Sequence, residues 1–136
     1  MSLSGRARDH GFQSLHYFRK RMRFNDVNFA AGIKIGRMPA RSFLMGIFWF
    51  KETAFNSSSS DTVQIGSTQG GSDILAATDV HSTGFTSHGS AAGLGTAVTF
   101  VANEIDLWVK WNATTVNTAT TGDATVIILY CPDNDL

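Results

Sequence analysis

Apolar and polar side chains alternate along several short stretches of this chain. The clearest stretch is 104–111, where every second residue is apolar: Ile105, Leu107, Val109 and Trp111. The residues between them are Glu104, Asp106, Trp108 and Lys110. Successive side chains of a β-strand point to opposite faces, so this pattern predicts a strand with one buried face.

Residues 17–24 predict a second strand of the same kind. One face carries Phe18, Lys20, Met22 and Phe24, and the other carries Tyr17, Arg19, Arg21 and Arg23. Asn25 and Asp26 favour a turn after it. A weaker strand is predicted over 27–35, ending where Gly36 to Pro39 interrupts the pattern.

The most apolar stretch is 41–50, which predicts a strand that is apolar on both faces. One face is predicted to hold Phe43, Met45, Ile47 and Trp49, and the other Leu44, Gly46, Phe48 and Phe50. Such a strand is covered on both sides by its own chain, or one side is an oligomer contact.

Further strands are predicted over 62–66, 96–101 and 124–130, the last one buried. The segment 67–95 is rich in Gly, Ser and Thr, and within it 73–77 predicts one helical turn capped by Ser72 or Asp73. Seven or eight short strands with polar turns favour an antiparallel sandwich or barrel. Eight strands suit a jelly-roll-like β-sandwich.

Composition agrees with an all-β chain. Thr, Val and aromatic residues are frequent, whereas Lys and Glu are scarce after residue 52. With 136 residues, we expect one domain over 17–136, preceded by an arm at 1–16. The first residues lack the apolar core of a signal peptide, and the single Cys131 excludes an intrachain disulfide, so we expect synthesis in a reducing cytoplasm and an inert, buried thiol.

Charge is divided unequally along the chain. Residues 1–51 hold ten of the eleven Lys and Arg but two acids, whereas 52–136 hold one cation and nine acids. The front segment thus carries about +8 and the rest about −8. We expect the front segment to contact an acidic surface, or acids of the same or a neighbouring copy.

Candidate catalytic groups are weak. His10, His16, His81 and His88 show no metal-ligand spacing, and Glu104 with Asp106 is best explained as a solvated strand face. No glycine stretch fits a phosphate-binding loop. We therefore predict no enzyme activity, no metal and no cofactor.

Aromatic and cationic residues interleave around residues 17–24, as in proteins that bind single-stranded nucleic acid. The acidic remainder would repel phosphate, so nucleic acid is the less favoured partner. Phe43, Trp49 and Trp108 are candidate interface anchors, because aromatic side chains are enriched at protein interfaces. The alternative for the two tryptophans is that they fill the core of the sandwich.

Residues 40–136 resemble the capsid cement (decoration) proteins of tailed bacteriophages, which have jelly-roll folds. The resemblance is carried by the order of three blocks: 43–50 with 53–56 and 63–66, then 73–80 with Gly84, and finally 121–130 with 132–134. It implies a structural virion protein that binds the outer capsid surface as a dimer or trimer and clamps neighbouring major capsid subunits.

On this hypothesis the positive segment 6–41 faces the capsid. The candidate capsid-binding residues are Arg19, Arg21, Arg23, Arg37 and Arg41. Two alternatives stay open: a glycan-binding module of a head or tail fibre, in which Trp108 stacks on a sugar ring, and a tail or connector subunit that assembles into rings.

Overall fold

The computed structural model describes residues 15–57, 60–89, 100–113 and 118–133, and within these ranges it is built from β-strands and turns. The strands, in chain order, are β1 (His16–Arg23), β2 (Ile33–Met38), β3 (Ser42–Thr53), β4 (Asp61–Gly66), β5 (Leu75–Asp79), β6 (Gly84–Gly89), β7 (Phe100–Val101), β8 (Ile105–Ala113) and β9 (Asp123–Cys131). The described part holds no helix long and apolar enough to cross a membrane.

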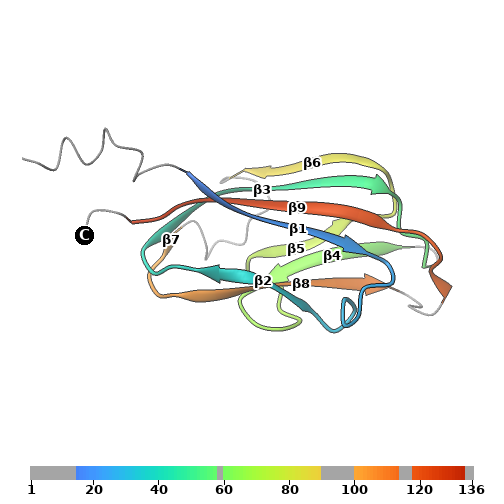
Figure 1. The fold of residues 1–136 in the computed structure, drawn as a ribbon, viewed down its shortest axis with the longest axis horizontal. Helices are drawn as coiled ribbons and strands as arrows, with labels where there is room; N and C mark the ends of the chain where they lie inside the picture. Colours follow the sequence, from blue (N-terminus) through green and yellow to red (C-terminus); the bar gives the residue numbers. More distant parts are fainter. Residues whose placement is uncertain (1–14, 58–59, 90–99, 114–117, 134–136) are drawn as a thin grey trace, which may run out of the picture.

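The strands form two antiparallel sheets that face each other (Figure 1). Sheet A has the order β1-β9-β3-β6, and the short β7 pairs with the beginning of β3. Sheet B has the order β2-β8-β4-β5. The predicted antiparallel β-sandwich is confirmed.

The strand pairs are nested around the β4–β5 connection, so strands before it pair with strands after it. Strands β4 and β5 pair with each other, β3 pairs with β6, β2 with β8, and β1 with β9. Two further pairs, β3·β9 and β4·β8, join these couples into the two sheets. As a result, the first strands of the chain lie beside the last ones.

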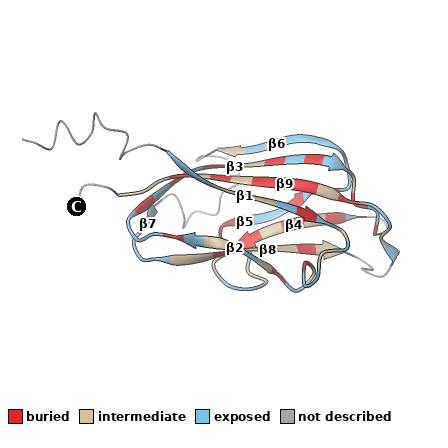
Figure 2. Ribbon diagram, in the orientation of Figure 1, coloured by how far each residue is buried: buried red, intermediate tan, exposed pale blue. Residues whose placement is uncertain are grey.

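The core lies between the sheets, where the inward faces of the strands are buried (Figure 2). Its largest side chains are Trp49, Trp111, Phe29 and Phe55. The rings of Phe29, Phe55 and Trp111 contact one another, with centroids 5.2–6.0 Å apart. Fully burying an aromatic side chain of this kind stabilises the fold by about 1.5–3 kcal/mol.

Two predicted alternations are confirmed. In β8, Leu107, Val109 and Trp111 are buried while the residues between them are partly exposed. In β1, Met22 is buried and its flanking partners Phe18 and Phe24 are half-buried. The outward residues of β1, namely Tyr17, Arg19, Arg21 and Arg23, are exposed as predicted.

The predicted helical turn at 73–77 is wrong, because this segment leads into the edge strand β5. Asp73 caps no helix. Its carboxylate accepts hydrogen bonds from the backbone N–H and the hydroxyl of Ser67, which closes the loop between β4 and β5. Ile74 and Leu75 are then buried against the core, which a solvated turn would not achieve.

The predicted second strand at 27–35 is only partly right. Residues 27–31 form turns, and β2 continues through Gly36 to Met38 instead of ending there. The pairing of β2 with β8 shifts between Lys34 and Gly36, so Ile35 is a bulge. A side chain at Gly36 would lie 2.7 Å from the Phe18 ring, so this glycine lets β1 and β2 approach across the sandwich.

The predicted faces of β3 are also wrong in part. Its pairing with β9 shifts between Leu44 and Gly46, which leaves Met45 as an extra residue. The bulge exchanges the two faces, so Phe43 and Met45 are exposed whereas Ile47 and Trp49 are buried. Strand β6 was missed within 67–95. The predicted arm at 1–16 and the strand at 96–101 fall largely outside the described residues.

Gly66, at the end of β4, lies directly against the backbone of Gly71. A Cβ at Gly66 would be 2.3 Å from the Gly71 carbonyl carbon, so one of the two backbones would have to move. We expect Gly66→Ala to lower the free energy of unfolding by about 1–3 kcal/mol, as overpacking does. Urea unfolding followed by fluorescence measures it. Ala76→Ser, at an exposed position of β5, is the control; equal midpoints for the two variants would contradict the packing.

Candidate functional site

Arg19, Arg21 and Arg23 share the outward face of β1, as the sequence predicts. Arg21 binds Asp123 of β9 with two hydrogen bonds, Nε–Oδ1 at 2.9 Å and Nη2–Oδ2 at 2.6 Å. It also reaches Glu52 of β3, and Arg23 lies 3.6 Å from the same Asp123. The Asp123 pKa is lowered, mainly by the hydrogen bonds from Arg21.

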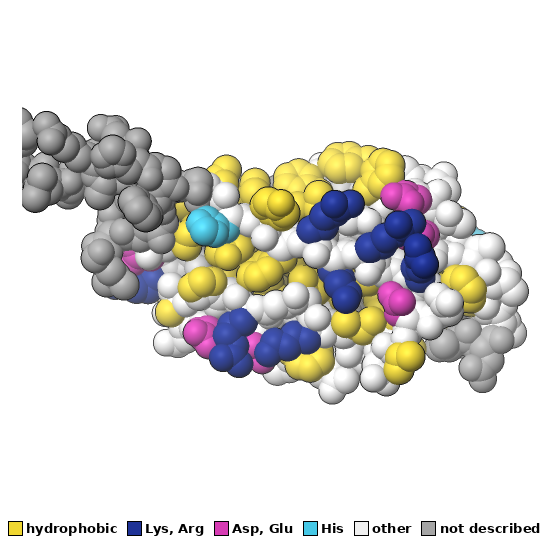
Figure 3. Space-filling model, in the orientation of Figure 1, with side chains coloured by type: hydrophobic (Ala, Val, Ile, Leu, Met, Phe, Trp, Pro, Cys, Tyr) yellow, Lys and Arg dark blue, Asp and Glu magenta, His cyan; other side chains and the backbone are white. Residues whose placement is uncertain are grey.

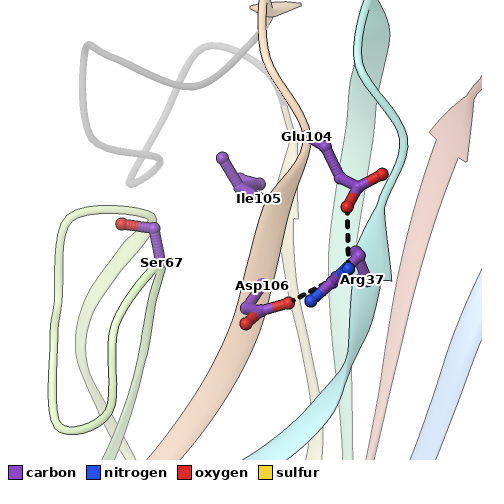
Figure 4. A pocket seen from close by; sticks show the side chains of 5 residues that line it. All are labelled: Arg37, Ser67, Glu104, Ile105 and Asp106. Carbon is purple, nitrogen blue, oxygen red and sulfur yellow. Dashed lines mark hydrogen bonds and ion pairs between the residues drawn. The ribbon is translucent and has the colours of Figure 1, made fainter.

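Arg37 lies on sheet B, away from the β1 arginines. It bridges Glu104, just before the neighbouring strand β8, and Asp106 of β8, each at 2.9 Å, on one wall of a shallow depression (Figure 4). Lys34 contacts the same Asp106 at 2.8 Å. Hydrogen bonds from Lys34 and Arg37 lower the pKa of Asp106, so this carboxylate is not tuned as a general acid.

Arg41 stands in the turn between β2 and β3, with a positive φ of 61°. Its Nε lies 2.5 Å from a carboxylate oxygen of Asp133, just beyond β9. The five candidate arginines therefore occupy three places, and four of them pair with acids of the same chain. Much of the positive charge of the front segment is thus balanced by acids of the same chain.

These ion pairs remain exposed to solvent. The side chains of Arg21, Arg37 and Arg41 keep about half or more of their surface accessible. Exposed pairs of this kind add little to stability, because water and salt screen them. The arginines are therefore still accessible to a partner with carboxylates.

The three aromatic candidates differ in exposure. Trp49 is 0% exposed and packs in the core, so it cannot contact another molecule; this prediction is wrong. Trp108 is half-buried on the outer face of sheet B, between Lys34 and Gly66 in the strand pairing. Phe43 is exposed near Cys131 and Phe100, its neighbours in β9 and β7.

Sequence reasoning missed the strongest apolar surface, which lies on the outer face of sheet A. Tyr17, Phe50 and Phe85 are 64%, 51% and 63% exposed. They line a shallow depression together with Arg19, Glu52, Thr125 and Ile127. Figure 3 shows hydrophobic side chains over β3 and β6, with Lys and Arg gathered next to them over β1. Phe50 was visible in the sequence alternation, but Phe85 lay in a segment read as a loop.

The buried carboxylate of Asp61 contacts several hydrogen-bonding groups. Asp61 is fully buried and accepts hydrogen bonds from the backbone N–H of Ser57, the Ser57 hydroxyl and Trp111 Nε1, at 2.5–3.0 Å. His81 Nδ1 lies 3.1 Å from Oδ2, the oxygen that also accepts the Ser57 backbone N–H. Burial alone would raise the Asp61 pKa, but the hydrogen bonds from Ser57, His81 and Trp111 lower it below the usual value.

Although this cluster contains Ser, His and Asp, it is not arranged for nucleophilic catalysis. In a catalytic triad the histidine lies between serine and aspartate and takes the serine proton. Here Asp61 lies between the other two, and Ser57 is buried and donates to Asp61 itself. The cluster instead fastens the β3–β4 and β5–β6 connections to β8.

The remaining chemical candidates are possible metal ligands, the histidines and the cysteine. No group of three His, Cys, Asp or Glu side chains capable of holding a metal is found in the described ranges. His88 lies 3.3 Å from the Thr78 hydroxyl, and burial lowers its pKa. Cys131 is half-buried, not buried as predicted. His10 lies outside the described residues.

Comparison with known proteins places this fold among phage capsid chains. A chain of the acid-stable capsid of Helicobacter pylori bacteriophage KHP30 matches with a TM-score of 0.61 and 9% identity, over 88% of this chain and 90% of that one. A chain of the cyanophage Pam1 capsid asymmetric unit has a TM-score of 0.61 and 14% identity, over 90% and 88%. A chain of the Ralstonia phage GP4 capsid has 0.57 and 15%, over 90% and 85%.

No protein-family model matches the sequence, and no curated protein matches it. At these identities the three structures establish a shared fold. The function of the chain is therefore argued from the fold and its surface together.

The Asp61 cluster predicts a dependence of stability on pH. A carboxyl whose pKa is lowered by folding stabilises the protein above its unfolded pKa of about 4, and this contribution is lost as the pH falls through the folded pKa. We expect Asp61→Asn to lose about 1–3 kcal/mol at neutral pH, because an amide NH₂ would face buried donors. The loss should shrink towards pH 3.

Chemical denaturation at a series of pH values measures this. Glu52→Gln makes the same carboxylate-to-amide change at an exposed position, so we expect a change within about 0.5 kcal/mol. A loss for Asp61→Asn that is equally large at pH 7 and pH 3 would show that the charge of Asp61 is not the cause.

Proposed function

We propose that the chain is a non-enzymatic structural protein of a tailed-phage virion that binds the outer capsid surface as a cement protein. The observation that carries this proposal is the similarity of fold to chains of three phage capsids, each over 88–90% of this chain. The residue blocks that resemble cement proteins form β3, β4, β5 and β9, which make up much of both sheets.

We also infer that the sandwich is a jelly roll. If β7 is set aside, the remaining eight strands pair as first with last, second with second-last, and so on inwards to the β4–β5 connection. A jelly roll is a double-sheet fold of eight strands, and rolling up an antiparallel ribbon paired in this way produces two four-stranded sheets.

The extent of the structural matches supports an accessory role. Each match covers 85–90% of the capsid chain concerned, so those chains are of similar length to this one. The similarity is therefore to whole small chains, not to one domain of a large subunit. A small chain bound in many copies can add up to substantial stabilisation of a shell, even if each copy contributes modestly.

The proposed partner is the major capsid protein, and the proposed assembly is a dimer or trimer on the virion surface. Of the candidate arginines, we keep Arg19, Arg21 and Arg23 as capsid-binding residues, because they share one face. Arg37 and Arg41 lie elsewhere on the molecule, beside Asp106 and Asp133, and are less suited to the same contact. Phe43 remains a candidate contact within the oligomer.

The glycan-binding alternative depends on an exposed Trp108. This side chain is half-buried and lines none of the surface depressions described above, so the capsid proposal is better supported. A tail or connector subunit would form rings, which electron microscopy of the purified protein would reveal.

The proposal is tested by mixing the purified protein with capsids assembled from the major capsid subunit of the same phage, and sedimenting the mixture. We expect saturable binding that weakens with added salt, because ion pairs between exposed groups are screened. Capsids already saturated with the unlabelled protein are the control, and should bind no further labelled protein. Absence of binding at every salt concentration would refute the cement role.

A further inference from the structure

The two outer faces of the sandwich differ in chemistry. On sheet B, outward side chains largely satisfy one another: Asn112 donates to Gln64 and Thr62, and Lys34 and Arg37 bind Asp106. The outer face of an antiparallel sheet is ordinarily polar in this way, because it faces water. Sheet A departs from this rule.

Exposed aromatic side chains lie on both edge strands of sheet A and on β3 between them, namely Tyr17, Phe85 and Phe50. In the strand pairing, Phe50 of β3 lies between Thr125 of β9 and Phe85 of β6, which is the last strand of sheet A among the described residues. The rings of Phe48 and Phe85 stack with centroids 6.1 Å apart. Contiguous exposed aromatic surface of this kind is typical of protein interaction sites.

The charged side chains around these aromatic residues differ in whether they are paired. Glu52 and Asp123 are both engaged by Arg21, and Arg23 also approaches Asp123. Arg19 lines the same depression beside Tyr17, Phe50 and Phe85, and no acid of the described residues pairs with it. The face therefore presents one cation that no acid of the described residues neutralises.

We propose that the outer face of sheet A is the surface that docks on the capsid, and that it binds an apolar patch of the major capsid subunit carrying a carboxylate opposite Arg19. This inference rests on the proposed function and specifies where the contact is made. The contact residues are Tyr17, Arg19, Phe50, Phe85 and Ile127.

A second copy of this chain fits the face less well. Face-to-face pairing of two copies would bury Arg19 of each, while Glu52 and Asp123 are already held by Arg21. A charge that loses water without gaining a partner is costly. A capsid surface with its own carboxylate avoids this cost, so charge complementarity favours a different protein as the occupant.

The test uses the full chain and the capsid sedimentation assay. We expect Phe50→Ser and Phe85→Ser each to weaken binding about tenfold or more, as for central aromatic contacts. Arg19→Glu should weaken it similarly and also reduce its dependence on salt. Val27→Ser removes an apolar side chain that is 82% exposed in the β1–β2 connection, and Lys110→Glu reverses a charge on sheet B; both controls should bind like the unaltered protein.

Thermal unfolding first confirms that each variant is folded, and analytical ultracentrifugation gives its mass. If the unaltered protein fails to bind capsids, the proposed function fails and this inference fails with it. If it binds, and the sheet A variants bind equally well, the docking face is wrong while the function stands. If those variants lose oligomeric mass but not capsid affinity, the face joins copies of this chain and the inference is overturned.

Discussion

The structure depends on antiparallel pairing between the two ends of the chain. Strand β9 lies between β1 and β3, and β8 lies between β2 and β4, so each sheet is completed by residues from the last third of the sequence. The unequal charge distribution follows this arrangement. Cations on β1 and β2 stand directly beside acids on β9 and β8, and the two oppositely charged segments neutralise each other across neighbouring strands.

Much of the fold was predictable because one buried face leaves a period of two in the sequence. This holds for β1 and β8, where Met22 and Trp111 take their expected inward places. It fails at Met45 and Ile35, because a bulge inserts one residue and exchanges the faces without leaving a mark in the hydrophobic pattern. Strands β5 and β6 escaped notice since both are edge strands with few apolar residues, recognisable only from their partners.

The candidate site was less predictable than the fold. The sequence gives the positions of Arg21 and Arg37, but not that Asp123 and Asp106 lie beside them, because those pairings arise from strand register. In the same way, no local pattern shows that Trp49 is buried and Phe50 exposed, because the bulge that sets their faces is not visible in the sequence. The longest-range hydrogen bond of the Asp61 cluster joins residues 50 positions apart in sequence, beyond the reach of any local motif.

The separation between paired residues has a consequence for how the protein is made. Arg21 and Asp123, which bind each other, are 102 residues apart in sequence. Contacts of such long range form slowly, and the edge occupied by β1 cannot close until nearly the entire chain has left the ribosome. The adjacent strands β4 and β5 form the most local pair, so assembly is expected to begin there and proceed outwards, with β1 and β9 incorporated last.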